Sequence, residues 1–147
     1  MATRYQLVID CAEPDRLAHF WAAALHYQIA PAPEGFDSWD DYFRDMGVDE
    51  SELGVGDDRI SDPEGGGPDI WFQQVPEPKI IKNRLHLDIS VGGGRDVPME
   101  TRKQRIHAEA LRLSELGAAT KRVLAEPGLD HYGIAMTDPE GNEFDIN

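Results

Sequence analysis

Four segments of this chain alternate polar and apolar side chains with the period of two that is typical of β-strands. The polar-facing positions are Gln6, Val8 and Asp10; Asp69, Trp71 and Gln73; His86, Asp88 and Ser90; and Glu143 and Asp145. A sheet face that presents an imidazole, carboxylates, amides and one large aromatic is typical of a binding cleft and not of a dry core. These residues are therefore the first candidates for binding and chemistry.

The opposite faces of the same segments are apolar, with Leu7 and Ile9, Ile70 and Phe72, Leu87 and Ile89, and Phe144 and Ile146. We expect them to pack against two helices. The first is predicted to begin at Pro14 and to run to Tyr27, because proline and the acidic Asp15 suit a first helical turn. The second is predicted over residues 99–116, with Gly117 as its stop. Its apolar stripe consists of Ile106, Ala110, Leu113 and Leu116.

The order of these elements occurs twice. Residues 62–71 match residues 138–147 at an offset of 76, with six of ten positions identical, including an Asp-Pro-Glu-Gly turn. Each half is predicted to contain a strand, a helix and then three strands. In the second half, two of the strands are expected at residues 85–91 and 131–137. The first half has a short extra helix, expected over residues 39–46. The loop at residues 76–79 is the expected linker, so module one covers about residues 1–76 and module two about residues 82–147.

The sequence thus predicts an α+β fold for one domain over residues 1–147. In it, two tandem βαβββ modules form a curved mixed sheet around a central cleft, and the helices lie on the outer face.

Composition excludes several classes of partner. The net charge is −14, from 14 basic and 28 acidic residues, which disfavours nucleic acid and anionic membranes. The acidic excess is concentrated between Asp37 and Glu64. Its simplest interpretation is a solvated surface, and the alternative is a surface that binds a cation or a basic partner. No apolar run approaches the ~20 residues of a membrane span, and no signal peptide is evident. With a single cysteine, Cys11, a cytoplasmic location is expected.

Two motifs carry a family resemblance. They are residues 82–89, KNRLHLDI, which open the second half, and residues 138–144, DPEGNEF, near the end. Together with the duplicated βαβββ order, they resemble the vicinal oxygen chelate superfamily and its glyoxalase-like domains, which include glyoxalases, bleomycin-resistance proteins and extradiol dioxygenases. The resemblance covers nearly the whole chain, and it identifies a fold better than a reaction.

The resemblance implies a metal site on the first and last strands of each module. Matched residue by residue, the ligands are Gln6 and His86 on the first strands and Asp69 and Asp145 on the last. Asp69 depends on the offset of 76, and a slip of two would place Trp71 there instead. An imidazole, two carboxylates and an amide oxygen suit Zn, Ni, Mn or Fe. The family pattern has Glu where this chain has Asp, so a cleft without a metal stays open as the alternative.

Three functions follow from the resemblance. The first is a metal-dependent lyase, isomerase or oxygenase acting on a small oxygenated molecule. Asp145 or Asp69 would take a proton in this enzyme, and the substrate would contact Trp71, Gln73, Asp88 and Arg84. The second is a metal-free protein that binds or sequesters a small molecule or antibiotic, with walls supplied by Trp39, Tyr42, Phe43 and Trp71. The third is an accessory module whose partner contacts the acidic residues 36–58. The resemblance also implies a homodimer.

Overall fold

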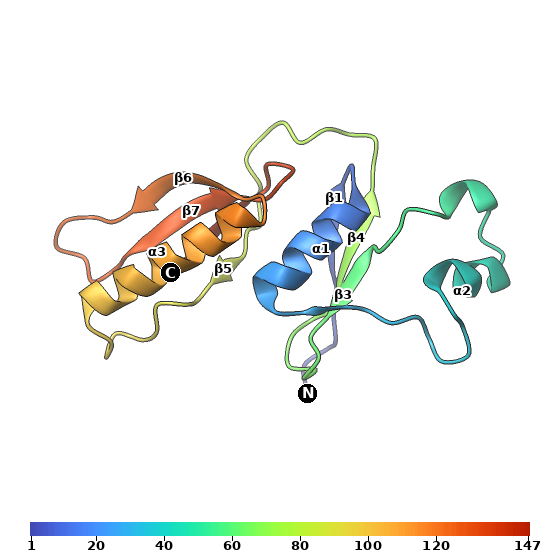
Figure 1. The fold of residues 1–147 in the computed structure, drawn as a ribbon, viewed down its shortest axis with the longest axis horizontal. Helices are drawn as coiled ribbons and strands as arrows, with labels where there is room; N and C mark the ends of the chain where they lie inside the picture. Colours follow the sequence, from blue (N-terminus) through green and yellow to red (C-terminus); the bar gives the residue numbers. More distant parts are fainter. The chain divides into compact units, whose positions relative to one another are not determined.

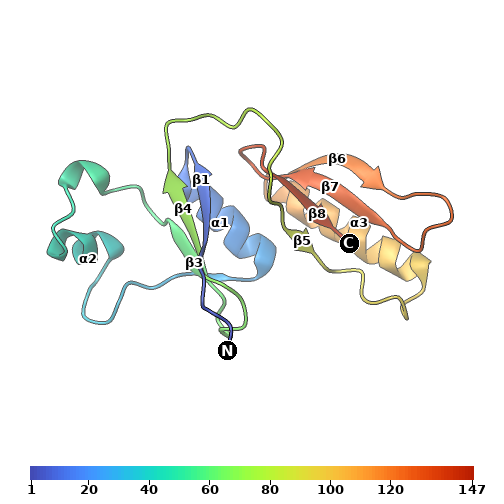
Figure 2. The ribbon, with the colours of Figure 1, turned by 180° about the vertical axis from the view of Figure 1, so that it is seen from behind.

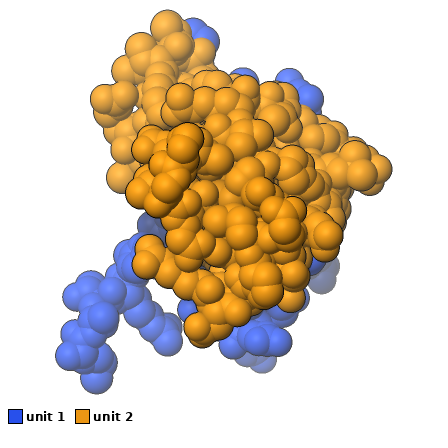
Figure 3. All heavy atoms as spheres, turned by 90° about the vertical axis from the view of Figure 1, so that its left-hand side faces the viewer, with its two compact units in different colours: residues 1–78 blue, residues 79–147 orange.

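Two four-stranded sheets, each with its own helix, make up the chain. The computed structural model describes all residues 1–147, which divide into unit 1, residues 1–78, and unit 2, residues 79–147 (Figure 3). Each sheet is mixed and has the same strand order, first-fourth-third-second. The predicted α+β fold with tandem βαβββ modules is therefore confirmed.

Unit 1 consists of the following elements (Figure 1): β1 (Leu7–Cys11), α1 (Pro14–Leu25), β2 (Gln28–Ile29), α2 (Trp39–Asp45), the 3-10 turn η1 (Glu50–Glu52), β3 (Arg59–Ser61) and β4 (Ile70–Gln74). β1 pairs with β4 in parallel, whereas β3 pairs with β4 and β2 antiparallel. Helix α1 begins at Pro14 as predicted. It buries Leu17, Phe20 and Trp21 together with Ile60, Ile70 and Phe72 of the sheet.

Unit 2 consists of β5 (Asp88–Ile89), α3 (Met99–Glu115), β6 (Ala119–Leu124), β7 (Gly133–Thr137) and β8 (Glu143–Ile146). β5 pairs with β8 in parallel, and β7 lies between β8 and β6 in antiparallel pairing. Figure 2 shows this sheet in front of α3. The core of the unit is formed by Ile106, Leu113, Ile134, Met136, Phe144 and Ile146.

Three details of unit 2 differ from the prediction. The strand expected over residues 85–91 shrinks to Asp88–Ile89, and Leu85 is 82% exposed. In the segment before β5, the backbone N–H of Asn83 donates to the Glu143 side chain instead of to a strand backbone. Leu116 follows the helix as its C-cap and is exposed, and His131 precedes β7 instead of opening it.

Both Asp-Pro-Glu-Gly turns are held by their aspartate side chains, which accept hydrogen bonds from the backbone of the turn. Asp62 accepts backbone N–H groups of Glu64, Gly66 and Gly67. Asp138 accepts those of Glu140 and Asn142 and is 3% exposed. These turns fix where the last strand of each unit starts.

The short helix predicted at residues 39–46 is present as α2. Ser38 caps it by accepting the N–H of Asp41, yet none of its residues is buried. None of the helices in the chain combines the length and the apolar character needed to cross a bilayer.

Candidate functional site

The polar face of unit 2 gathers an imidazole and two carboxylates. Asp88 and Asp145 face each other across the parallel pair β5–β8, whereas Phe144 and Ile146 of β8 point to the opposite, buried face. His86 lies two residues before Asp88 and reaches both carboxylates. The alternation of side chains along β8 is therefore what separates the polar site from the core.

The three side chains are within reach of one ion. His86 Nε2 lies 3.4 Å from Asp88 Oδ1 and 3.6 Å from Asp145 Oδ2, and the ligand atoms of the three residues all lie within 4.8 Å of one another. Their side chains are 39%, 56% and 26% exposed for His86, Asp88 and Asp145. One nitrogen and two carboxylate oxygens with open access to solvent fit a divalent ion such as Mn, Fe, Ni or Zn.

A third carboxylate, Glu143, lies two residues before Asp145 on β8. Its Oε2 accepts the N–H of Asn83 at 3.0 Å and lies 3.1 Å from Lys79 Nζ, and Lys121 Nζ lies 3.4 Å from Oε1. The Asn83 hydrogen bond and the Lys79 ammonium lower the pKa of Glu143 to about 2. Glu143 thus stays ionised and fixes the segment that leads to His86.

The strand registers show which residues of unit 1 correspond to this site. Ile60 and Met136 stand two residues before their turns, at an offset of 136 − 60 = 76. Ile60 pairs with Ile70 and Met136 with Phe144, so beyond the turns the offset is 144 − 70 = 74. The first turn is therefore two residues longer than the second.

This slip changes one of the four predicted metal ligands. Trp71, not Asp69, occupies the position equivalent to Asp145, and Asp69 is an exposed residue just before β4. The structure therefore corrects the equivalence assumed for Asp69. The equivalence of Gln6 and His86 is kept. Phe72 and Ile146 are equivalent at the offset of 74, and they pair with Ile9 and Ile89. Gln6 and His86 each lie three residues before these isoleucines.

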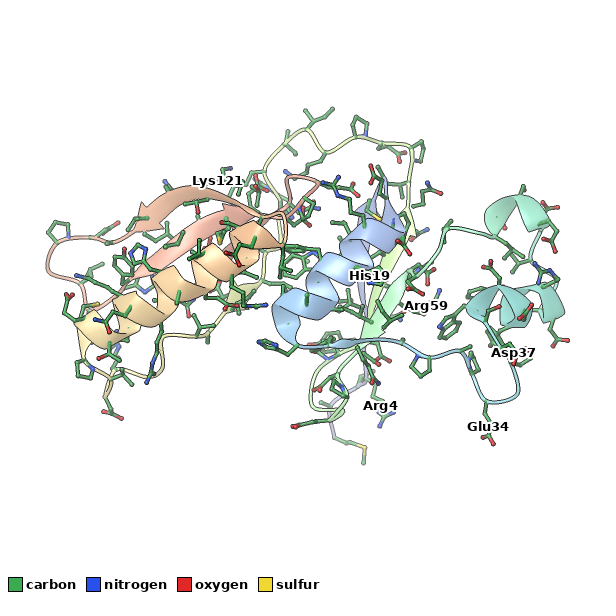
Figure 4. The ribbon with its side chains drawn as sticks, in the orientation of Figure 1. Arg4, His19, Glu34, Asp37, Arg59 and Lys121 are labelled. Atoms are coloured by element: carbon green, nitrogen blue, oxygen red, sulfur yellow. The ribbon has the colours of Figure 1, made fainter.

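Trp71 is held in a cluster that sequence reasoning missed. Its Nε1 donates to Asp58 Oδ2 at 3.1 Å, and the same carboxylate accepts two hydrogen bonds from Arg59. The Arg59 guanidinium lies 4.2 Å from the Trp39 ring centre and 5.1 Å from that of Phe43. Figure 4 shows Arg59 on the side of β3 toward α2. The strand alternation places Arg59 beside buried Ile60, but only the register brings it opposite Trp71.

The remaining predicted contacts are surface residues. Gln6 and Gln73 are exposed in unit 1, and Arg84 is exposed in the segment before β5 of unit 2. Asp88, predicted to contact substrate, lies beside His86 and Asp145. The spacing of two between His86 and Asp88 was the signal in the sequence for this grouping.

Comparison with known proteins agrees with this architecture. A family model described as a glyoxalase-like domain matches residues 6–147. Among solved structures, a glyoxalase/bleomycin resistance protein/dioxygenase family enzyme from Burkholderia phytofirmans PsJN is 14% identical with a TM-score of 0.58, over 97% of this chain and 94% of that one. The fosfomycin resistance protein FosX from Listeria monocytogenes is 9% identical with a TM-score of 0.61, over 100% and 90% of the two chains.

TioX from Micromonospora sp. ML1 is 13% identical with a TM-score of 0.50, over 99% of this chain and 97% of that one. At these identities the structural likeness establishes the fold alone. A search of curated protein sequences gave no match. Because the family model spans nearly the whole sequence, the chain belongs to the glyoxalase-like domain family.

Proposed function

We propose that this chain is a divalent-metal-dependent enzyme acting on a small oxygenated molecule, with His86, Asp88 and Asp145 as the metal ligands. The observation that carries the proposal is the convergence of one imidazole and two carboxylates within 4.8 Å, from the paired strands β5 and β8 and the segment just before β5. When bound, the ion would act as a Lewis acid on a substrate oxygen. This chemistry is consistent with a lyase, an isomerase or an oxygenase.

The protein's own groups have distinct parts in this proposal. Asp145 is the less exposed of the two carboxylates, and we assign it the transfer of a proton to or from the substrate. Arg84, two residues before His86, is the cation available to an anionic substrate group. The E126Q mutant of FosX from Listeria monocytogenes has been crystallised with Mn(II) and 1S,2S-dihydroxypropylphosphonic acid, so a protein of this fold can hold a divalent ion together with a small oxygenated acid.

The competing function, a metal-free binding protein, depends on aromatic walls. Trp39, Phe43 and Trp71 face the Arg59 guanidinium, and Trp71 also donates to Asp58. One face of each of these three rings is therefore turned toward the protein's own cation. That contact favours the metal-dependent function over the sequestering one.

Metal titration tests the proposal. Protein stripped with EDTA is titrated with Mn²⁺ by calorimetry and by electron paramagnetic resonance. We expect one Mn²⁺ per chain in this site, with an affinity at least about tenfold lower in His86→Ala and Asp145→Asn, since each loses a direct ligand. The control is His131→Ala, which removes an exposed imidazole of the same unit outside the cluster. Equal Mn²⁺ affinity in all four proteins would refute the assignment.

A further inference from the structure

A second group of metal-ligating side chains lies in unit 1, away from the polar sheet face. Asp15 and His19 are four residues apart on α1 and therefore project from the same side of that helix. Figure 4 labels His19 on α1. His19 Nε2 lies 3.0 Å from Asp57 Oδ2 and 3.9 Å from Asp15 Oδ1. As at His86, these three ligand atoms lie within 4.8 Å of one another.

The backbone holds Asp57 in this position. Its N–H donates to Asp15 Oδ1 at 2.9 Å. The preceding residue, Gly56, has φ +82°, and a Cβ there would lie 2.5 Å from Asp15 Oδ1. Only glycine satisfies both the conformation and the close approach. The end of the acidic segment, residues 36–58, therefore passes directly over the Asp15 side chain.

The charges of the cluster are not balanced by the protein. Neither Asp15 nor Asp57 forms an ion pair with a lysine or an arginine, and His19 is the partner of both. One imidazole balances at most one of the two negative charges. The surrounding residues 37–64 add eleven acidic side chains, Asp57 among them, against two basic ones. A bound cation would relieve this repulsion.

We propose that Asp15, His19 and Asp57 bind a divalent transition-metal ion of the zinc type, which ties the acidic segment to α1. A nitrogen and two carboxylate oxygens from two parts of the chain are a donor set that such ions accept. A groove of about 510 Å³, lined by Asp15, Gly54 and Val55 among others, adjoins the cluster and gives the ion access to solvent. This site is separate in sequence and in unit from His86, and its role is structural.

The number of zinc ions bound per chain tests this proposal. Protein stripped with EDTA is titrated with Zn²⁺ by calorimetry, and bound zinc is measured by elemental analysis after gel filtration. We expect two equivalents in the unmodified protein, one in His19→Ala and one in His86→Ala. Asp57→Asn, which retains the shape of the side chain, should also lose one equivalent. The control is His26→Asn, because His26 ends the same helix with φ +58°, which asparagine tolerates.

Hydrogen exchange provides a second readout that does not depend on activity. Zn²⁺ should slow amide exchange in residues 53–58 of the unmodified protein and leave the same residues unchanged in His19→Ala. Zinc stoichiometry and exchange that are identical in His19→Ala and the unmodified protein would overturn the inference. A total of one zinc equivalent in the unmodified protein, lost in His86→Ala and retained in His19→Ala, would do the same. A single equivalent lost only in His19→Ala would support this site and count against the metal centre at His86.

Discussion

One aspartate in each Asp-Pro-Glu-Gly turn determines how the following strand starts. Asp138 is 3% exposed and accepts the N–H groups of Glu140 and Asn142 together with the Asn142 amide. Asp138→Ala would leave these half-buried donors without the acceptor they use. We expect a loss of about 2 kcal/mol in the free energy of unfolding, measured by urea denaturation.

The matched control for this change is Asp62→Ala in the equivalent, more exposed turn of unit 1. Water can replace Asp62 as an acceptor, so the loss there should be smaller. A larger loss for Asp62→Ala than for Asp138→Ala would contradict the argument from burial.

Glu143 makes stability depend on acid pH. Its folded-state pKa of about 2 lies below the ordinary value of 4.5. A carboxyl group with a lowered pKa contributes stability above its unfolded pKa and loses that contribution as the pH falls toward the folded value. We expect the denaturation midpoint to fall between about pH 4.5 and pH 2, and to fall less steeply in Glu143→Gln. Parallel pH profiles for the two proteins would contradict this role.

Most elements could be predicted from the sequence because their local signals agree with their packing. Pro14 and the apolar stripe of α1 fix that helix, and Gly117, with φ +115°, follows the end of α3. The extent of β5 could not be predicted, since Leu85 alternates correctly but has no neighbouring strand to pair with. An alternating pattern shows which residues can form a strand, but not how many a partner will pair.

The candidate site, too, could be predicted from the sequence only in part. The sequence brings together His86 and Asp145, and the structure adds Asp88 to them. The slip from an offset of 76 to 74, which exchanges Asp69 for Trp71, lies in a glycine-rich turn whose length has no periodic signal. The pairing of Asp57 with His19 joins residues 38 positions apart and depends on tertiary structure alone.

Arg59 anchors the acidic segment to the sheet of unit 1. Its guanidinium donates twice to Asp58 and lies against Trp39, and the side chains of Arg59 and Asp58 are only 14% and 11% exposed. Arg59→Ala would leave a nearly buried carboxylate without its cation. We expect a loss of about 3 kcal/mol in stability and faster amide exchange in α2. Arg59→Lys keeps the charge but not the paired hydrogen bonds. Its stability should therefore lie between those of the unmodified protein and Arg59→Ala.

The measurement for Arg59 combines guanidinium chloride denaturation with exchange read separately in α2 and in α3. Because α3 belongs to unit 2, its exchange at low denaturant serves as the internal reference. Unchanged exchange in α2 of Arg59→Ala would show that the segment is held by other contacts.

At the scale of the whole molecule, the dominant property is a net charge of −14 on 147 residues. Like charges repel most strongly in the compact state, so salt should stabilise the fold. Raising NaCl from about 10 mM to about 500 mM shortens the Debye length from about 30 Å to about 4 Å. We expect the melting temperature to rise by several degrees over this range in the presence of EDTA.

The control for the salt effect uses two exposed acidic residues without ion pairs, Glu34 and Asp37, which point outward from unit 1 (Figure 4). The double variant Glu34→Gln and Asp37→Asn lowers the charge from −14 to −12 without removing a structural contact. Its melting temperature should be higher at low salt and should depend less on NaCl. If instead salt lowered the melting temperature of both proteins, local ion pairs such as Arg59–Asp58 would outweigh the general repulsion, because screening weakens attraction and repulsion alike.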